Sequence, residues 1–295
     1  MTTANSSAST ATRRISPIWL VLVGILSVQF GAGVAKDLFD EAHPTTIVWV
    51  RLAVSALVLA AIARPALRGR SREDWLVVLA FGATLGLMNW SIYQAFARIP
   101  LGIAVTIEFV GPLTLAVLGS RRPRDLLWVA LAAAGVLLLG LERADLTVAG
   151  VLFALLAGAA WASYILLSAQ TGRRWPGFDG LTMASVIATV LLVPLLLEAG
   201  GTSALDEGRV LLLGALVGLL SSVIPYTCEL VALRSLRPSV FSVLMSLEPA
   251  AAALAGLVVL RELLSPVQLL AMACVVAASI GATRSGATIG EPVPD

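Results

Sequence analysis

The stretch LGIAVTIEFVGPLTLAVLG, residues 101–119, is long enough to cross a bilayer as a helix and contains one charged residue, Glu108. A carboxylate near the centre of a bilayer costs roughly 2.5–3.5 kcal/mol on insertion scales, so a chain that keeps one there usually uses it. The segment SVLMSLEPAAAALAGLVVL, residues 242–260, repeats the pattern with Glu248. The two segments predict a membrane protein with two functional acids near the midplane.

The composition also indicates a chain embedded in lipid. Of its 295 residues, 58% are hydrophobic and 13% are charged, and the mean hydropathy is +0.93. Soluble domains carry about a quarter charged residues. The net charge of +2 does not indicate nucleic-acid binding, because a basic excess in a membrane protein usually comes from its cytoplasmic loops. Cys228 and Cys274 lie in apolar runs, which predicts small buried side chains rather than a disulfide or a metal site.

Ten apolar segments of spanning length alternate with short polar connections. They lie at 17–35, 45–63, 75–97, 101–119, 125–141, 147–168, 181–199, 209–233, 239–260 and 265–283. Backbone groups find no water in the bilayer core, so runs of this length must be helices. Residues 1–16 and 284–295 are polar and are expected to be tails, without a signal-peptide cleavage pattern. The sequence therefore predicts an all-α integral membrane protein with ten transmembrane helices.

Basic residues gather in alternate connections, which predicts the orientation of the chain. One side has Arg13, Arg14, Arg64, Arg68, Arg70, Arg72, Arg121, Arg122, Arg124, Arg173, Arg174, Arg234, Arg237 and Arg284. The other side has Lys36, Arg98, Arg143, Arg209 and Arg261. By the positive-inside rule the first side is cytoplasmic, so both termini are expected in the cytoplasm.

The two halves of the chain are expected to form an inverted repeat. Five helices in each half would insert the second half upside down relative to the first. Aligning Pro112 with Pro249 sets Glu108 opposite Met245 and Glu248 opposite Gly111 without a gap. Both glutamates then occupy the same face of equivalent helices, one turn apart. We expect them to belong to one central site.

Six segments carry a family resemblance: SVQFGAGVAKDLF, PLGIAVTIEFVGPL, GSRRPRD, GAAWASYILLSAQ, SSVIPYTCELVAL and LMSLEPAAAALAGLVVLRELLSPVQLLA. They resemble the EamA-type drug/metabolite transporter superfamily, and within it the threonine and homoserine exporters of the bacterial inner membrane. The resemblance implies two inverted EamA repeats, at 17–141 and 147–283, and proton-driven export of small solutes by alternating access. In one departure, Arg261 precedes Glu262 where many relatives have Gly-Glu.

Several polar residues within the predicted helices are candidates for the site. Arg51 either pairs with Glu108 or holds a substrate carboxylate in two parallel hydrogen bonds. Glu229 lies near the cytoplasmic end of its helix beside Pro225, and it either lines an inner vestibule or reaches toward the interface. A zwitterionic amino acid would meet Arg51 with its carboxylate and a glutamate with its ammonium group.

A second set of candidates is uncharged. Helix 75–97 has a polar and aromatic face that includes Asn89 and Tyr93, which either packs against other helices or contacts substrate. Gln29 and Tyr164 are similar candidates. Two G-x-x-x-G motifs, at 82–86 and 214–218, are expected to allow close helix packing.

The leading hypothesis is a secondary transporter in the bacterial inner membrane that exchanges protons at Glu108 or Glu248. The alternatives are an exporter of another small solute or drug, a membrane-embedded enzyme that uses the two acids as general acid and base, and a scaffold. We find no Walker motif or metal cluster, and the single histidine, His43, lies in a connection. We therefore expect no cofactor, and a small-molecule substrate, protons and membrane lipid as partners. The oligomeric state stays open, a homodimer included.

Overall fold

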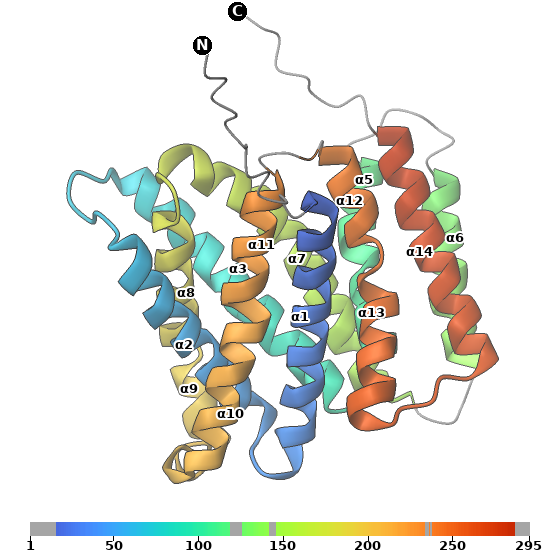
Figure 1. Cartoon of the computed structure of the whole chain (residues 1–295), viewed down its shortest axis with the longest axis horizontal. Helices are drawn as coiled ribbons and strands as arrows, with labels where there is room; N and C mark the ends of the chain where they lie inside the picture. The colour runs from blue at the N-terminus through green and yellow to red at the C-terminus, as the bar shows by residue number, and fades with distance from the viewer. Residues whose placement is uncertain (1–15, 119–125, 142–145, 234–235, 237, 287–295) are drawn as a thin grey trace, which may run out of the picture.

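The computed structural model of the chain describes residues 16–118, 126–141, 146–233, 236 and 238–286. Every regular element in these ranges is helical, and the helices pack side by side as a bundle (Figure 1). Helix α1 (Pro17–Asp37) begins and helix α14 (Pro266–Gly286) ends at the same end of the bundle, the top in Figure 1. We call this the terminal end and the opposite one the distal end. The predicted all-α class is confirmed.

The remaining elements follow in chain order. Those before residue 142 are η1 (Leu38–Asp40), α2 (Pro44–Ala63), α3 (Arg72–Phe96), α4 (Leu101–Glu108), α5 (Val110–Leu118) and α6 (Leu126–Leu141). Those after it are α7 (Val148–Arg174), α8 (Asp179–Leu191), α9 (Val193–Glu198), η3 (Ser203–Asp206), α10 (Gly208–Gly218), η4 (Leu219–Val223), α11 (Ile224–Leu233), α12 (Pro238–Met245), α13 (Glu248–Ala255) and η5 (Gly256–Leu260).

By length and hydropathy, the described residues contain 7 helices that could cross a membrane. Three further apolar helices, at Leu101–Leu115, Leu126–Leu139 and Gly208–Val223, are shorter. The membrane-spanning class is thus supported, and the count of ten remains a prediction.

The predicted spans 101–119 and 239–260 are each divided into separate helices, and proline explains both breaks. Proline has no N–H, so it cannot bond to the carbonyl four residues earlier. Pro112 leaves the carbonyl of Glu108 unbonded within its helix, and the chain breaks between α4 and α5 at Phe109. Pro249 has the same relation to Met245, where α12 ends. Both glutamates singled out by the sequence therefore lie at helix breaks.

Glycine brings backbones together at the predicted G-x-x-x-G motifs. A Cβ added at Gly82 on α3 would lie 2.6 Å from the Ile187 Cβ on α8. One added at Gly218 would lie 3.1 Å from the carbonyl oxygen of Arg51 on α2. The predicted close helix packing is confirmed, and at Gly218 it sets the position of the Arg51 backbone.

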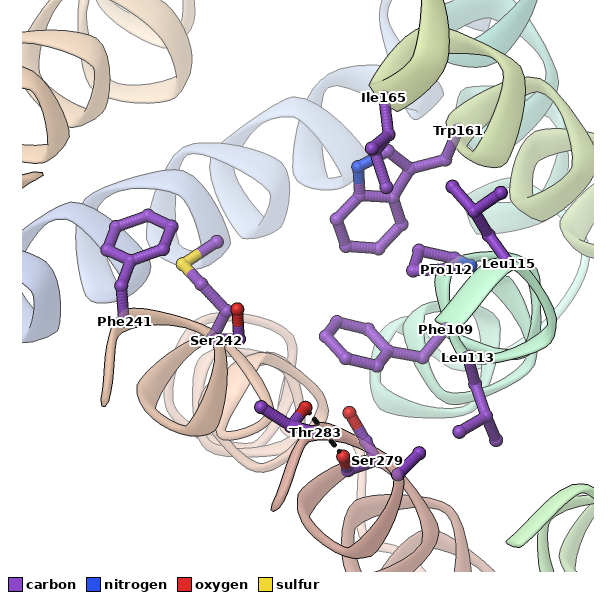
Figure 2. Close-up of a pocket in the computed structure, with 12 residues that line it drawn as sticks. Phe109, Pro112, Leu113, Leu115, Trp161, Ile165, Phe241, Ser242, Ser279 and Thr283 are labelled. Carbon is purple, nitrogen blue, oxygen red and sulfur yellow. Dashed lines mark hydrogen bonds between the residues drawn. The ribbon is translucent and has the colours of Figure 1, made fainter. Parts of the chain in front are cut away.

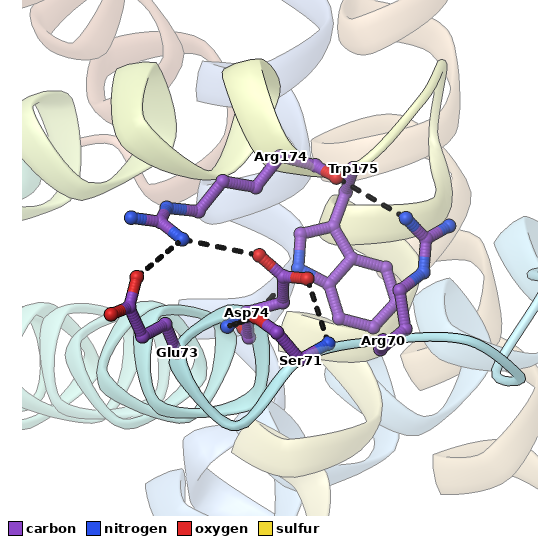
Figure 3. A network of polar contacts seen from close by, with 6 residues as sticks. All are labelled: Arg70, Ser71, Glu73, Asp74, Arg174 and Trp175. Carbon is purple, nitrogen blue, oxygen red and sulfur yellow. Dashed lines mark hydrogen bonds and ion pairs between the residues drawn. The ribbon is translucent and has the colours of Figure 1, made fainter.

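At the terminal end, a polar network fixes α3 against α7 (Figure 3). Arg174 contacts Glu73 at 3.3 Å and Asp74 at 3.2 Å. Asp74 also completes a capping box with Ser71 at the start of α3, which satisfies two backbone N–H groups. The indole of Trp175 donates to the Asp74 carbonyl at 3.3 Å. These contacts hold the start of α3 against the end of α7.

Candidate functional site

Arg51 projects from α2 between α3 and η4. One guanidinium nitrogen donates to the Tyr93 hydroxyl at 3.4 Å, and another donates to the Ser221 carbonyl at 3.2 Å. The guanidinium carbon lies 5.5 Å from the centre of the Tyr93 ring, within cation–π range. The third nitrogen, Nε, is buried without a hydrogen-bond partner among the described residues. Arg51 thus binds two protein groups and leaves one donor unpaired.

The Ser221 carbonyl can accept from Arg51 because of Pro225. Pro225 lies four residues after Ser221 and cannot donate the helical bond that this carbonyl would otherwise receive. The chain forms a π-helical turn, η4, over the same residues, and such turns are frequent at functional sites. Ser221 was not among the candidates predicted from the sequence. The proline four residues later, Pro225, could have indicated that the Ser221 carbonyl lacks its helical hydrogen bond.

Glu108 ends α4 in the interior of the bundle, where it is 9% exposed. Arg51 acts electrostatically on Glu108, but no ion pair joins the two in the described part of the chain. The direct partners of the guanidinium are Tyr93 and Ser221 instead. In this conformation neither side chain binds the other directly, so the Glu108 carboxyl group is not held by Arg51.

Glu248 begins α13 and is also 9% exposed. Helices α4 and α13 cross where Gly102 meets Ala253, because a Cβ added at Gly102 would lie 2.9 Å from the Ala253 Cα. From this contact, at 1.5 Å per residue, Glu108 lies about 9 Å along α4 and Glu248 about 7.5 Å along α13. The helices run in opposite directions, with α4 starting and α13 ending toward the distal end (Figure 1). The two carboxylates therefore lie at the same level of the bundle.

Gln29 on α1 is 3% exposed, and its Oε1 has no hydrogen-bond partner among the described residues. By helix spacing it continues the face of Val21 and Ile25, which packs against Ala251 of α13. The Ser221 hydroxyl is likewise buried without a described partner. Buried polar groups normally find partners, so unpaired atoms on facing elements need an explanation.

The other uncharged candidates have local partners. The Asn89 amide donates to the Leu85 carbonyl in its own helix at 2.9 Å, and the Tyr164 ring packs on Phe81 with centroids 5.1 Å apart. Trp90 and Gln94, on the same helix as Asn89, both donate to the Thr45 hydroxyl of α2 at 3.2 Å. This face thus bonds within the protein, and Tyr93 does so through Arg51. The Glu229 side chain lies outside the described part of the structure.

A cavity of about 450 Å³ opens between α5, α7, α12 and α14 (Figure 2). Its wall includes the aromatic rings of Phe109, Trp161 and Phe241 and the hydroxyls of Ser242 and Thr283. Phe109 follows Glu108 directly, and its ring meets Trp161 edge-on with centroids 5.0 Å apart. Since α5 continues from Glu108 toward the terminal end, the cavity lies on the terminal side of the glutamates (Figure 1). These lining residues were not among the candidates predicted from the sequence.

The distal end has a different arrangement. Lys36 Nζ and Glu262 Oε1 form an ion pair at 2.6 Å that joins α1 to the segment before α14. In the sequence Glu262 stands out only through its neighbour Arg261, and no pattern predicts a contact for Lys36. In the described ranges, no cluster of three or more His, Cys, Asp or Glu residues could hold a metal ion.

Comparison with known proteins agrees with the resemblance in the motifs. Residues 148–284 match the EamA-like transporter family. The threonine/homoserine exporter RhtA of Escherichia coli strain K12 is 41% identical over 278 residues, which covers 92% of this chain and 93% of the exporter. The exporter of the same name from Salmonella typhimurium strain LT2 is 39% identical over 281 residues, 92% of this chain and 94% of the exporter.

Two other matches are more distant. The uncharacterized transporter YwfM of Bacillus subtilis strain 168 is 34% identical over 160 residues, 53% of each chain. A solved crystal structure superposes with a TM-score of 0.61 over 88% of this chain and 95% of the matched one. At 19% identity it shows a shared fold. The similarity to the exporters extends over nearly the full length of both proteins, so this chain belongs to the EamA-like transporter family and resembles its threonine/homoserine exporters.

Proposed function

We propose that this protein exports small amino acids, with threonine and homoserine as the first candidates, across the bacterial inner membrane in exchange for protons. The single observation that carries the proposal is the 41% identity to a threonine/homoserine exporter over 92% of the chain. The chemistry of the Arg51 region is consistent with this class of substrate. The relatives are named as transporters, which favours transport over the membrane-embedded enzyme.

An inverted repeat of five plus five helices is part of the proposal. With Pro112 aligned on Pro249, the bounds of α4 (Leu101–Glu108) coincide with those of α12 (Pro238–Met245). In the same register, α3 (Arg72–Phe96) matches the run from α10 to α11 (Gly208–Leu233). The three shorter apolar helices then serve as spans, which gives the predicted ten. Matching breaks in matching helices support a duplicated unit.

The residues around Arg51 offer the groups that a zwitterionic amino acid requires. The unpaired Nε of Arg51 is a charged donor for the substrate carboxylate, and charge-assisted bonds of this kind are about twice as strong as neutral ones. The carboxylates of Glu108 and Glu248, at one level of the bundle, are acceptors for an ammonium group or a proton. The free Oε1 of Gln29 and hydroxyl of Ser221 add polar contacts for a substrate hydroxyl.

The cavity beside Phe109 is the proposed route from the cytoplasm. It opens on the terminal side of the glutamates, which is cytoplasmic if the basic connections face inward. Its wall combines aromatic rings with the hydroxyls of Ser242 and Thr283, so it can pass a small polar solute with an apolar portion. A substrate entering here would reach the level of Glu108 next.

Transport in proteoliposomes tests the proposal. Purified protein should move labelled threonine or homoserine outward when an inward proton gradient is imposed. Glu108→Gln and Glu248→Gln keep size and hydrogen bonding but remove the titratable charge, so gradient-driven efflux should fall while the protein still folds. Glu198→Gln, at an exposed carboxylate at the end of α9, is the matched control.

Different outcomes contradict different parts of the proposal. Full proton-driven efflux in both interior glutamate variants would exclude proton exchange at these residues. Movement of dyes or drugs with no movement of either amino acid would retain an exporter and overturn the amino-acid assignment.

A further inference from the structure

Lys36 and Glu262 make three contacts at the distal end of the bundle. Its Oε1 pairs with Lys36 Nζ at 2.6 Å, and its Oε2 accepts from the Leu101 N–H at 2.8 Å. Lys36 Nζ also donates to the Ile99 carbonyl at 2.8 Å. Both charged side chains are more than four-fifths buried, at 18% and 19% exposure. We call this set of contacts the Lys36–Glu262 latch.

The local backbone is shaped to form the latch. Arg261 adopts a left-handed conformation with φ of 57°, and the Glu262 N–H then bonds back to the Gly256 carbonyl at 3.0 Å. The absence of a side chain at Gly256 matters, since a Cβ there would lie 2.8 Å from Glu262 Oε2. Left-handed backbone favours glycine, yet Arg261 adopts it here. The turn at Arg261 thereby directs the Glu262 carboxylate toward Lys36 and Leu101.

The latch connects directly to the helix that carries Glu108. Leu101 is the first residue of α4, so the Glu262 carboxylate caps the positive N-terminal end of this helix. Glu108 is the last residue of the same eight-residue helix. Opening the distal end would have to separate α1 from α4 or from the segment before α14, and each separation breaks a latch contact.

We propose that the Lys36–Glu262 latch is the extracytoplasmic gate of the transporter, with Lys36 and Glu262 as residues that position α4. The inference rests on the proposed transport function and deepens it. The structure has a cavity on the terminal side of the glutamates and a latch on their distal side. This is the arrangement of a conformation open to the cytoplasm, and releasing the latch accompanies release of substrate outside. Transport requires the latch to break and to form again in each cycle.

Accessibility of one cysteine tests the gate independently of substrate. Ala252 is fully buried on α13, one turn beyond Glu248 on the same face and on the latch side of it. Ala252→Cys is placed in a chain whose Cys228 and Cys274 are replaced by alanine. A membrane-impermeant methanethiosulfonate reagent is then added outside intact cells, and the labelling rate is measured.

Breaking the latch should expose this cysteine. Lys36→Met or Glu262→Gln should raise the labelling rate roughly fivefold or more, at the lower end of conformational couplings between sites. Lys36→Arg keeps the charge and should label like the parent. The control is Glu41→Gln, which breaks the more exposed pair between Arg209 and Glu41 and should leave labelling unchanged. Unchanged labelling in both latch variants would overturn the gate.

A second measurement tests the gate even if the single variants reduce the amount of folded protein. Cysteines at positions 36 and 262, joined by a short bis-methanethiosulfonate reagent, should stop efflux, and dithiothreitol should restore it. Full efflux by the cross-linked protein would overturn the proposal. If labelling responds as expected but neither threonine nor homoserine is moved, the substrate assignment fails while the gate stands.

Discussion

Gly158 on α7 packs close against the backbone of Glu108, and this contact provides a test of how the bundle positions the residue. A Cβ added at Gly158 would lie 2.5 Å from the Glu108 carbonyl oxygen and 3.3 Å from the Gly111 nitrogen. A Cβ at Gly111 would in turn lie 1.9 Å from the Gly158 carbonyl oxygen. These neighbours are backbone atoms, which cannot rotate away. Gly158→Ala must therefore push α7 away from the break between α4 and α5.

The size of the effect follows from these distances. Carbon and carbonyl oxygen pack at about 3.3 Å or more, so the helices must separate by roughly 0.8 Å. Overpacking of this kind typically costs about 1–3 kcal/mol. The same substitution at Gly172 on α7 meets nothing within 4 Å. Because alanine is favoured over glycine within a helix by about 0.5–1 kcal/mol, Gly172→Ala should stabilise the protein slightly.

Melting temperature in detergent and proton-driven efflux measure the two consequences. Gly158→Ala should lower the melting temperature by a few degrees and reduce efflux roughly tenfold, since a misplacement of about 1 Å at a functional site can cost up to about 100-fold in rate. Gly172→Ala should raise the melting temperature slightly and leave efflux unchanged. Equal stability and equal efflux in the two variants would refute the inference that contact with α7 positions Glu108.

Three further predictions concern topology, Arg51 and pH. A reporter fused after Asp295 should be active in the cytoplasm and a tag in the 200–208 loop accessible from outside; the reverse would overturn the ten-helix model. Arg51→Ala should lose about 1.5–3 kcal/mol of stability with its two hydrogen bonds. Adding Glu108→Gln should recover part of this loss only if Arg51 mainly neutralises Glu108, and a calorimetric double-mutant cycle decides. Burial and then Arg98 lower the pKa of His43, whose Nδ1 accepts from the Thr45 N–H at 3.2 Å. The stability that neutral His43 contributes to the fold is therefore present above pH 6.5 and is lost as the pH falls further. The melting temperatures of His43→Asn and the parent, measured between pH 5 and 8, should converge at low pH.

The local sequence pattern was sufficient to predict the class of protein and the interior positions of its two glutamates. Apolar runs such as 101–119 must be helical because lipid offers no partner for an unbonded backbone group, so the all-α class follows without tertiary information. The interior positions of Glu108 and Glu248 follow from their places within those runs. The breaks at these residues were also readable, since Pro112 and Pro249 each remove a hydrogen bond four residues earlier, although the sequence analysis drew each span as one helix.

Tertiary structure decided the partners of the charged residues. The sequence left open whether Arg51 pairs with Glu108 or binds a substrate carboxylate. In the fold it binds Tyr93 and the carbonyl of Ser221, which lies 170 positions further along the chain. Lys36 and Glu262 read as separate loop charges until the bundle brought them within 2.6 Å. The length of an apolar run indicates which segments enter the membrane. It does not determine how each helix is rotated or which helix lies beside it. Those choices depend on side-chain packing between distant segments, and they determine where charges meet and where a cavity remains.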